Sequence, residues 1–259
     1  MLSDIEKYYN KFNEDKRLDS RHGRVEFNTS MHFISKYAKK FKNAKVIDIG
    51  AGTGKYSIAL KKMGCDVTAV ELVKHNLRVI EQKDKTIKAF QGNALNLKKI
   101  ADGQFDITIL FGPMYHLFST KDRIKALQEA KRVTKVGGII FVAYYMNDYA
   151  IIKHGFVDGN IVKSVDDNLV DKNFKILSNP SGLYSMERIE DIKSYSNQCK
   201  LKRLFMFAPD GASDYIRKSL NAMDEKTFDL FLKYQLSICK RKEMLGASSH
   251  IVDVLKKID

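Results

Sequence analysis

A short apolar segment followed by a glycine-rich turn is the part of the chain best suited to hold a ligand. Residues 46–49 carry β-branched side chains and are typical of a buried strand. Gly50, Gly52 and Gly54 follow at alternate positions, and a helical pattern begins at Lys55. In a strand–turn–helix unit, residues without a Cβ let the backbone approach a nucleotide-like ligand closely.

The spacing of the glycines separates this turn from two other nucleotide-binding loops. The dinucleotide fingerprint needs its last glycine where this chain has Lys55, which argues against an NAD-dependent oxidoreductase. The phosphate-binding P-loop needs Ser or Thr after Gly-Lys, but Tyr56 stands there.

A carboxylate lies about 20 residues after the turn, at the end of the next predicted strand. That strand covers residues 66–70, and Glu71 follows it. Adjacent parallel strands in a right-handed unit bring their carboxyl ends together. Glu71 is therefore placed to accept hydrogen bonds from the two hydroxyls of a ribose, and its charge would strengthen them.

Two motifs resemble those of a known enzyme family. The pattern Asp48-x-Gly50-x-Gly52-x-Gly54 resembles the first motif of class I S-adenosylmethionine-dependent methyltransferases. Gly112-Pro113-Met114-Tyr115-His116-Leu117 resembles the Gly-Pro-Leu-Tyr-His-Leu element found in a subset of that family. The resemblance is strong over residues 45–145 and loose in the flanks.

The alternation of strands and helices predicts an α/β fold with a doubly wound, mostly parallel sheet. The resemblance implies the Rossmann-like methyltransferase fold, with seven strands and the last one antiparallel. We expect residues 1–43 to form an N-terminal helical lid, with helices over 4–13 and 26–41. Residues 44–259 would form the methyltransferase domain, with cap insertions near 146–183 and 209–245.

The resemblance implies S-adenosylmethionine as cofactor, S-adenosylhomocysteine as product, and no metal. Asn93 stands where the family commonly has an acid, and its amide can still meet a purine edge. Arg21 and Glu26 begin the second helix, either as ligand contacts or as solvated charges. The expected cofactor-binding residues are Asp48, Gly50, Ala51, Gly52, Gly54, Glu71, Leu72, Asn93, Ala94, Leu95, Phe111, Gly112, Arg21 and Glu26.

Candidate acceptor-site residues lie after the fourth and fifth predicted strands. Tyr115 and His116 are expected to line the substrate pocket, and Tyr144 and Tyr145 are further candidates for a base or a cation–π contact. We interpret His250, near the start of the last strand, as a packing residue.

The predicted reaction is methyl transfer to an O, N or C atom of a small-molecule acceptor. The chain lacks the Asn/Asp-Pro-Pro-Tyr/Phe element of amino-group methylation and the Pro-Cys nucleophile of cytosine-C5 enzymes. An RNA or protein methyltransferase is one alternative, supported by the net charge of +14. The lysines are spread along the chain, however, so a nucleic-acid partner is less favoured. A non-catalytic S-adenosylmethionine-binding regulatory protein is the alternative from another class.

Composition is that of an ordinary globular protein, with 44% hydrophobic and 29% charged residues among 259. No apolar run approaches the roughly 20 residues that a membrane helix needs, so no membrane partner is expected. Cys65, Cys199 and Cys239 are far apart and odd in number. They suggest neither a disulfide framework nor a metal site, and we expect a cytoplasmic protein.

Overall fold

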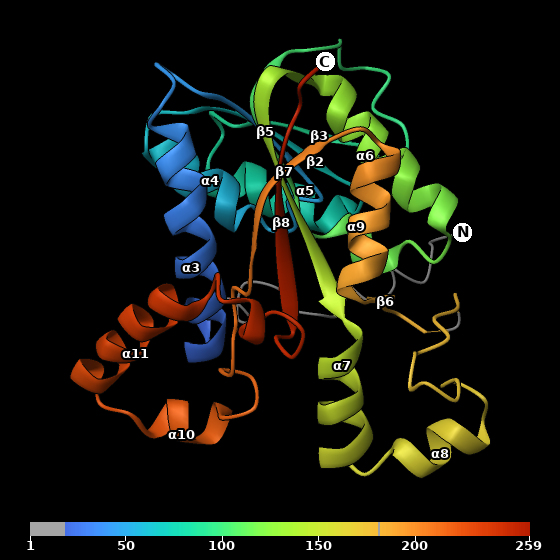
Figure 1. Ribbon diagram of the computed structural model, residues 1–259. Coiled ribbons are helices and arrows are strands. Elements are labelled where there is room, and N and C mark those ends of the chain that lie inside the picture. The colour runs from blue at the N-terminus through green and yellow to red at the C-terminus, as the bar shows by residue number, and fades with distance from the viewer. Residues whose placement is uncertain (1–18, 181) are drawn as a thin grey trace.

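A single mixed sheet forms the centre of the molecule (Figure 1). The computed structural model describes residues 19–180 and 182–259. Along the sheet the strand order is β3-β2-β1-β4-β5-β8-β7, and the two-residue β6 pairs with β5 beside this path. The strands are β1 (Lys45–Ile49), β2 (Asp66–Glu71), β3 (Lys88–Gln91), β4 (Phe105–Leu110), β5 (Thr134–Met146), β6 (Met186–Glu187), β7 (Lys202–Phe207) and β8 (His250–Lys256).

Strand direction follows the prediction of a mostly parallel sheet with an antiparallel last strand. β1, β2, β3, β4 and β5 pair in parallel, whereas β8 runs antiparallel to both β5 and β7. The strand order reverses between β1 and β4, and open α/β sheets bind ligands at such a switch point. The predicted doubly wound Rossmann-like fold is therefore confirmed.

Helices cover both faces of the sheet (Figure 1). One apolar core contains side chains of α3, α4 and α5, and the other contains side chains of α6 and α9. The helices are α3 (Arg21–Ala38), α4 (Lys55–Lys62), α5 (Lys74–Lys83), η1 (Pro113–His116), α6 (Thr120–Val133), α7 (Asn147–Ala150), η2 (Ile151–Val157), α8 (Ile161–Asp166), α9 (Ile189–Gln198), α10 (Arg217–Ala222), α11 (Glu225–Ile238) and η3 (Lys242–Met244). No helix in the described ranges is long and apolar enough to cross a membrane.

The N-terminal helix begins earlier than predicted. Its pattern predicted a start at residue 26, but α3 begins at Arg21 because the Ser20 hydroxyl accepts the Gly23 N–H and caps it. Val25 then packs against Leu220 and Phe228 of α10 and α11. The predicted helix over residues 4–13 lies outside the described residues.

Two further segments have features that the sequence pattern does not indicate. Residues 135–138 include two glycines but belong to β5, which has an irregular register opposite Phe105 and Ile107. Gly138 is required there because a Cβ would lie 2.6 Å from Thr134 Cγ2. Residues 146–183 contain the helices α7, η2 and α8, although their sequence shows no regular pattern of apolar and polar residues.

A buried ion pair fixes the chain after the residue 146–183 segment. Arg123 of α6 lies 2.6 Å from Glu187 of β6, and both side chains are less than 10% exposed. Tyr195 donates a hydrogen bond to Glu187, and the Ser185 N–H donates to the carbonyl of Tyr115 at 2.7 Å. This network therefore ties residues 185–187 to η1, which carries two of the predicted site residues.

Replacing Arg123 with alanine should destabilise the protein by about 3–5 kcal/mol, because it leaves Glu187 buried without its cation. The free energy of unfolding, measured by urea titration, tests this. The matched control is Lys163→Ala, which removes a surface pair with Asp167 and should leave stability unchanged. A loss for Arg123→Ala no larger than that of the control would show that the buried pair is not stabilising.

Candidate cofactor and acceptor site

All three glycines of the loop have backbone conformations that favour glycine. The φ angles of Gly50, Gly52 and Gly54 are +76°, +56° and +82°. A Cβ on Gly50 would lie 2.4 Å from Cδ of Pro113, and a Cβ on Gly54 would lie 2.8 Å from Ile80. The glycine loop thus packs directly against the Gly-Pro-Met-Tyr-His element, which begins 62 positions after Gly50 in the sequence.

Glu71 links the end of β2 to this loop. One carboxylate oxygen accepts the Gly52 N–H at 2.8 Å, and the other accepts the Val73 N–H at 2.8 Å. Asn76 also hydrogen-bonds the Glu71 carboxylate, and the acceptor capacity that remains can take hydroxyl donors. Burial raises the pKa of Glu71 to about 7, although hydrogen bonds from Val73, Gly52 and Asn76 act in the opposite direction.

Asp48 is the second buried acid of the loop. It accepts a hydrogen bond from the Ser57 hydroxyl at 2.6 Å, which joins β1 to α4. Burial raises the pKa of Asp48 to about 6. Two carboxylates with raised pKa values therefore lie beside a loop whose backbone approaches the cavity closely.

A cavity of about 710 Å³ opens along the carboxyl ends of the strands. It brings together the predicted residues of both motifs and the loop after β3. Tyr115 and His116 line it. Twelve of the fourteen predicted cofactor residues also line it, namely Glu26, Asp48, Gly50, Ala51, Gly52, Glu71, Leu72, Asn93, Ala94, Leu95, Phe111 and Gly112.

Two predicted residues do not line the cavity. Gly54 lies behind the loop against Ile80, where it begins α4. Arg21 forms an ion pair with Glu225 at 2.7 Å and lies over the ring of Phe228. In the described structure its guanidinium therefore fastens α3 to α11, and a contact with the cofactor stays a prediction.

The acceptor candidates differ in position. Tyr145 lines the cavity, but Tyr144 points to the other face of the sheet, packs near Tyr195 and is buried there. This difference follows from the alternation of side chains along β5. His116 donates a hydrogen bond from Nδ1 to the Leu183 carbonyl at 2.9 Å, and burial lowers the pKa of His116.

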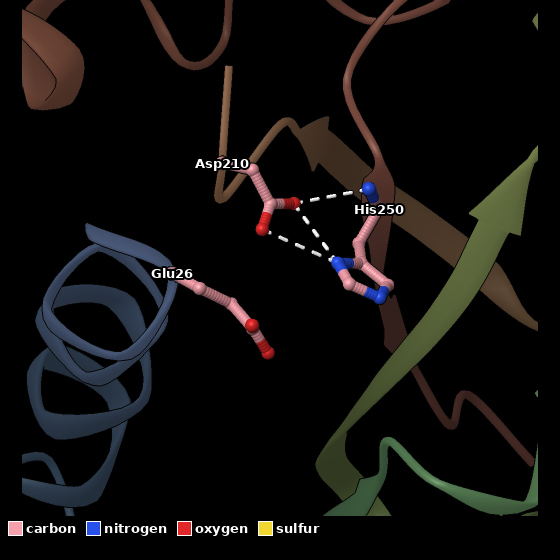
Figure 2. A group of neighbouring side chains, drawn as sticks. All are labelled: Glu26, Asp210 and His250. Atoms are coloured by element: carbon pink, nitrogen blue, oxygen red, sulfur yellow. Dashed lines mark hydrogen bonds and ion pairs between the residues drawn. The ribbon is translucent and has the colours of Figure 1, made fainter. Parts of the chain in front are cut away.

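Sequence reasoning missed a group of polar residues at the β5–β8 end of the cavity. Asp210 follows β7, and His250 begins the antiparallel β8, opposite Tyr145. The Asp210 carboxylate lies 3.1 Å from Nδ1 of His250 and accepts the His250 backbone N–H at 3.0 Å. Figure 2 shows Glu26 of α3 pointing towards the same space. Tyr184, Asp214 and Arg217 are further lining residues that sequence reasoning missed.

A signal for Asp210 was present in the sequence. It comes three residues after the end of an apolar strand and precedes a glycine. His250 was interpreted as a packing residue because the resembled family also ends with a Gly-Ala-Ser-like turn, a His and a strand. The structure places it in the cavity wall.

Comparison with known proteins shows similarity in sequence and in fold. Residues 47–142 match the family model described as "Methyltransferase domain". A solved structure of an S-adenosylmethionine-dependent methyltransferase from Methanosarcina mazei superimposes with a TM-score of 0.56, over 87% of this chain and 97% of that one. It is 14% identical, so this likeness concerns the fold alone.

The central segment is therefore similar in sequence to methyltransferase domains, and two curated relatives match it over a similar length. A glycine/sarcosine N-methyltransferase of Parasynechococcus marenigrum (strain WH8102) is 30% identical over 115 residues, 42% of this chain and 41% of that protein. A demethylmenaquinone methyltransferase of Paenarthrobacter aurescens (strain TC1) is 38% identical over 102 residues, 39% of this chain and 38% of that protein. The matches thus span about two fifths of these relatives.

The raised pKa of Glu71 predicts a stability that depends on pH. Between its ordinary value of 4.5 and about 7, the unfolded chain has released this proton and the folded protein keeps it. The free energy of unfolding should therefore fall as pH rises through this interval, by about 1.4 kcal/mol per pH unit from this group. Glu71→Gln removes that loss, so the variant should gain stability relative to the wild type from pH 5 to pH 8.

Urea unfolding of both proteins without added ligand, at several pH values, measures the difference. Glu81→Gln, on the exposed side of α5, is the control and should give a difference that does not change with pH. A constant difference between Glu71→Gln and the wild type from pH 5 to pH 8 would contradict the account.

Proposed function

We propose that the protein transfers the methyl group of S-adenosylmethionine to a nucleophilic atom of a small molecule bound in the same cavity. The observation that carries the proposal is Glu71, whose carboxylate is held at the edge of the cavity by Gly52 and Val73. Support also comes from the family match over residues 47–142, which includes both motifs.

The residues of the cavity fit the cofactor on structural grounds. Asp48, Glu71 and the loop of Gly50 and Gly52 lie on one side, where a Cβ on Gly50 would collide with Pro113. Glu71 would hold the ribose, and Asn93 with Leu95 would meet the adenine. The Asn93 side-chain oxygen accepts the Leu95 N–H at 2.9 Å, which fixes the position of this side chain relative to the Leu95 backbone.

When bound, S-adenosylmethionine supplies an electrophilic methyl group on a sulfonium. The chain's task is then to align the acceptor and exclude water, since methyl transfer is an in-line displacement. Tyr115, Tyr145, Tyr184 and His116 form the wall that would do so. Ring centroids of Tyr145 and Tyr184 lie 5.7 Å apart, and those of His116 and Tyr184 lie 5.4 Å apart.

Acidic residues predominate in the lining, which favours a small molecule over RNA. The described lining contains Glu26, Asp48, Glu71, Asp210 and Asp214, whereas its cationic residues are Lys55 and Arg217. A polyanionic acceptor would meet carboxylates at the site of reaction, which is unfavourable in a partly buried cavity. The relatives' names, which concern glycine or sarcosine and demethylmenaquinone, agree with small acceptors.

Calorimetric titration with S-adenosylhomocysteine tests the cofactor assignment. Each hydrogen bond to a charged group contributes about 1.5–3 kcal/mol, so Glu71→Ala should weaken binding at least about tenfold. Glu81→Ala should bind like the wild type, and NAD should not bind to either. Circular dichroism verifies that the variants are folded.

Equal affinity of the wild type and Glu71→Ala for S-adenosylhomocysteine would overturn the assignment. Tight binding without methyl transfer to any small molecule of a cell extract would instead indicate the non-catalytic regulatory protein.

A further inference from the structure

The β5–β8 end of the cavity carries more negative than positive charge. Glu26, Asp210 and Asp214 line it and are each less than 10% exposed, and Arg217 is the cation among the described residues there. Arg217 hydrogen-bonds Asp214 at 2.8 Å and is directed to that carboxylate. The carboxylates of Glu26 and Asp210 therefore give this end of the cavity a negative potential that favours a cationic ligand.

Aromatic rings surround the same space. The ring centroid of His250 lies 5.3 Å from that of Tyr115 and 5.2 Å from that of Tyr145. Tyr184 extends this wall, since it packs on both Tyr145 and His116. Carboxylates beside aromatic faces form a site that favours an organic cation over a neutral ligand, because both groups attract positive charge.

His250 has the arrangement of a general base. Asp210 accepts from Nδ1, which fixes the proton on that nitrogen and leaves Nε2 as the acceptor. Figure 2 shows Nε2 directed away from Asp210. Asp210 is itself held in place, because it accepts the His250 backbone N–H and lies beside Ser248, whose hydroxyl accepts the Gly211 N–H.

We propose that the methyl acceptor is a small protonated amine, that Glu26 attracts its charge, and that His250 removes its proton before the transfer. The proposal rests on the proposed methyltransferase function. Asp210 is a positioning residue, since it acts through His250.

The step balances in atoms and charge. An ammonium group has no lone pair, so Nε2 of His250 first takes one proton and leaves a neutral amine. The amine nitrogen then forms a bond to the methyl carbon as the carbon–sulfur bond breaks, and the electron pair of that bond stays on sulfur as a neutral thioether. The product is a methylammonium, and His250 passes its proton to solvent.

The same three residues could be read as metal ligands. Glu26, Asp210 and His250 place one donor atom each within 4.8 Å of one another. However, Nδ1 of His250 already bonds Asp210, so two of the three donors satisfy one another. The arrangement therefore agrees better with a His–Asp pair than with a metal centre.

Binding to the S-adenosylhomocysteine complex is the first test, and it needs no turnover. Calorimetry compares a panel of primary amines, such as phenethylamine and butylamine, each with the alcohol of the same shape. We expect at least one amine to bind more than about tenfold more tightly than its alcohol, and Glu26→Gln to remove that preference. No preference for any amine over its alcohol would overturn the proposal.

Methyl transfer to the best-binding amine is the second test. His250→Gln should lower kcat by about 100-fold or more at pH 7 with little change in KM, because a general base contributes about 10²–10⁴-fold. Raising the pH should restore part of the rate, since solvent then deprotonates the amine. Asp210→Asn should show the same split, and His75→Gln, on the exposed side of α5, should match the wild type.

The charged and titratable groups facing His250 are Glu26 and His22 of α3, Asp210, Asp214, Arg217, Tyr115 and Tyr145. Because these groups also titrate, the recovery at high pH is measured as the ratio of the His250→Gln rate to the wild-type rate at each pH. A variant rate that stays low at every pH, with unchanged affinity for S-adenosylhomocysteine, would exclude the base role.

Two outcomes separate this inference from the proposed function. If S-adenosylhomocysteine binds and only a neutral acceptor is methylated, the amine proposal fails while the methyltransferase assignment stands. If EDTA abolishes amine methylation and Mg²⁺ or Mn²⁺ restores it, the three residues are metal ligands and the base role is wrong.

Discussion

The interaction on which the site depends is the pair of hydrogen bonds that Glu71 accepts from Gly52 and Val73. These bonds hold the glycine loop of β1 against the end of β2, so that both face one cavity. Removing the carboxylate would release the loop and also the proposed partner of the ribose. One side chain thereby links the local conformation of three glycines to the shape of the ligand site.

Sheet topology brings the remaining groups to the same edge. Parallel strands β1, β2, β3, β4 and β5 supply residues from their carboxyl ends, and the antiparallel β8 supplies His250 from its start. Asp210, which follows β7, is joined to His250 across this edge. The cofactor half and the proposed acceptor half are thus built from different strands of one sheet, with the Gly112–His116 element between them.

Much of this architecture could be predicted because its signals are local. Alternating apolar strands and helices indicate the doubly wound sheet, and the glycine spacing with Glu71 marks one half of the cavity. Gly52 and Glu71 meet in the structure because parallel strands align their ends, which is a general rule. The extent of α3 was missed because its start depends on a Ser20 cap and on packing against α10 and α11.

The acceptor half was harder to predict because it is assembled over long sequence separations. Glu26, Asp210 and His250 come from three elements, and nothing in their spacing indicates that they meet. Tyr144 and Tyr145 are adjacent in sequence, so only the register of β5 with β8 determines which one faces the cavity. Such choices depend on tertiary packing.

The central claim is that one cavity holds both the cofactor and its acceptor, with Glu71 at one end and His250 at the other. A crystal structure of the complex with S-adenosylhomocysteine tests it most directly. The account predicts both ribose hydroxyls on the Glu71 carboxylate and the sulfur directed towards Tyr115 and His250. A ligand bound outside this cavity, or one with its sulfur turned away from the β5–β8 end, would contradict it.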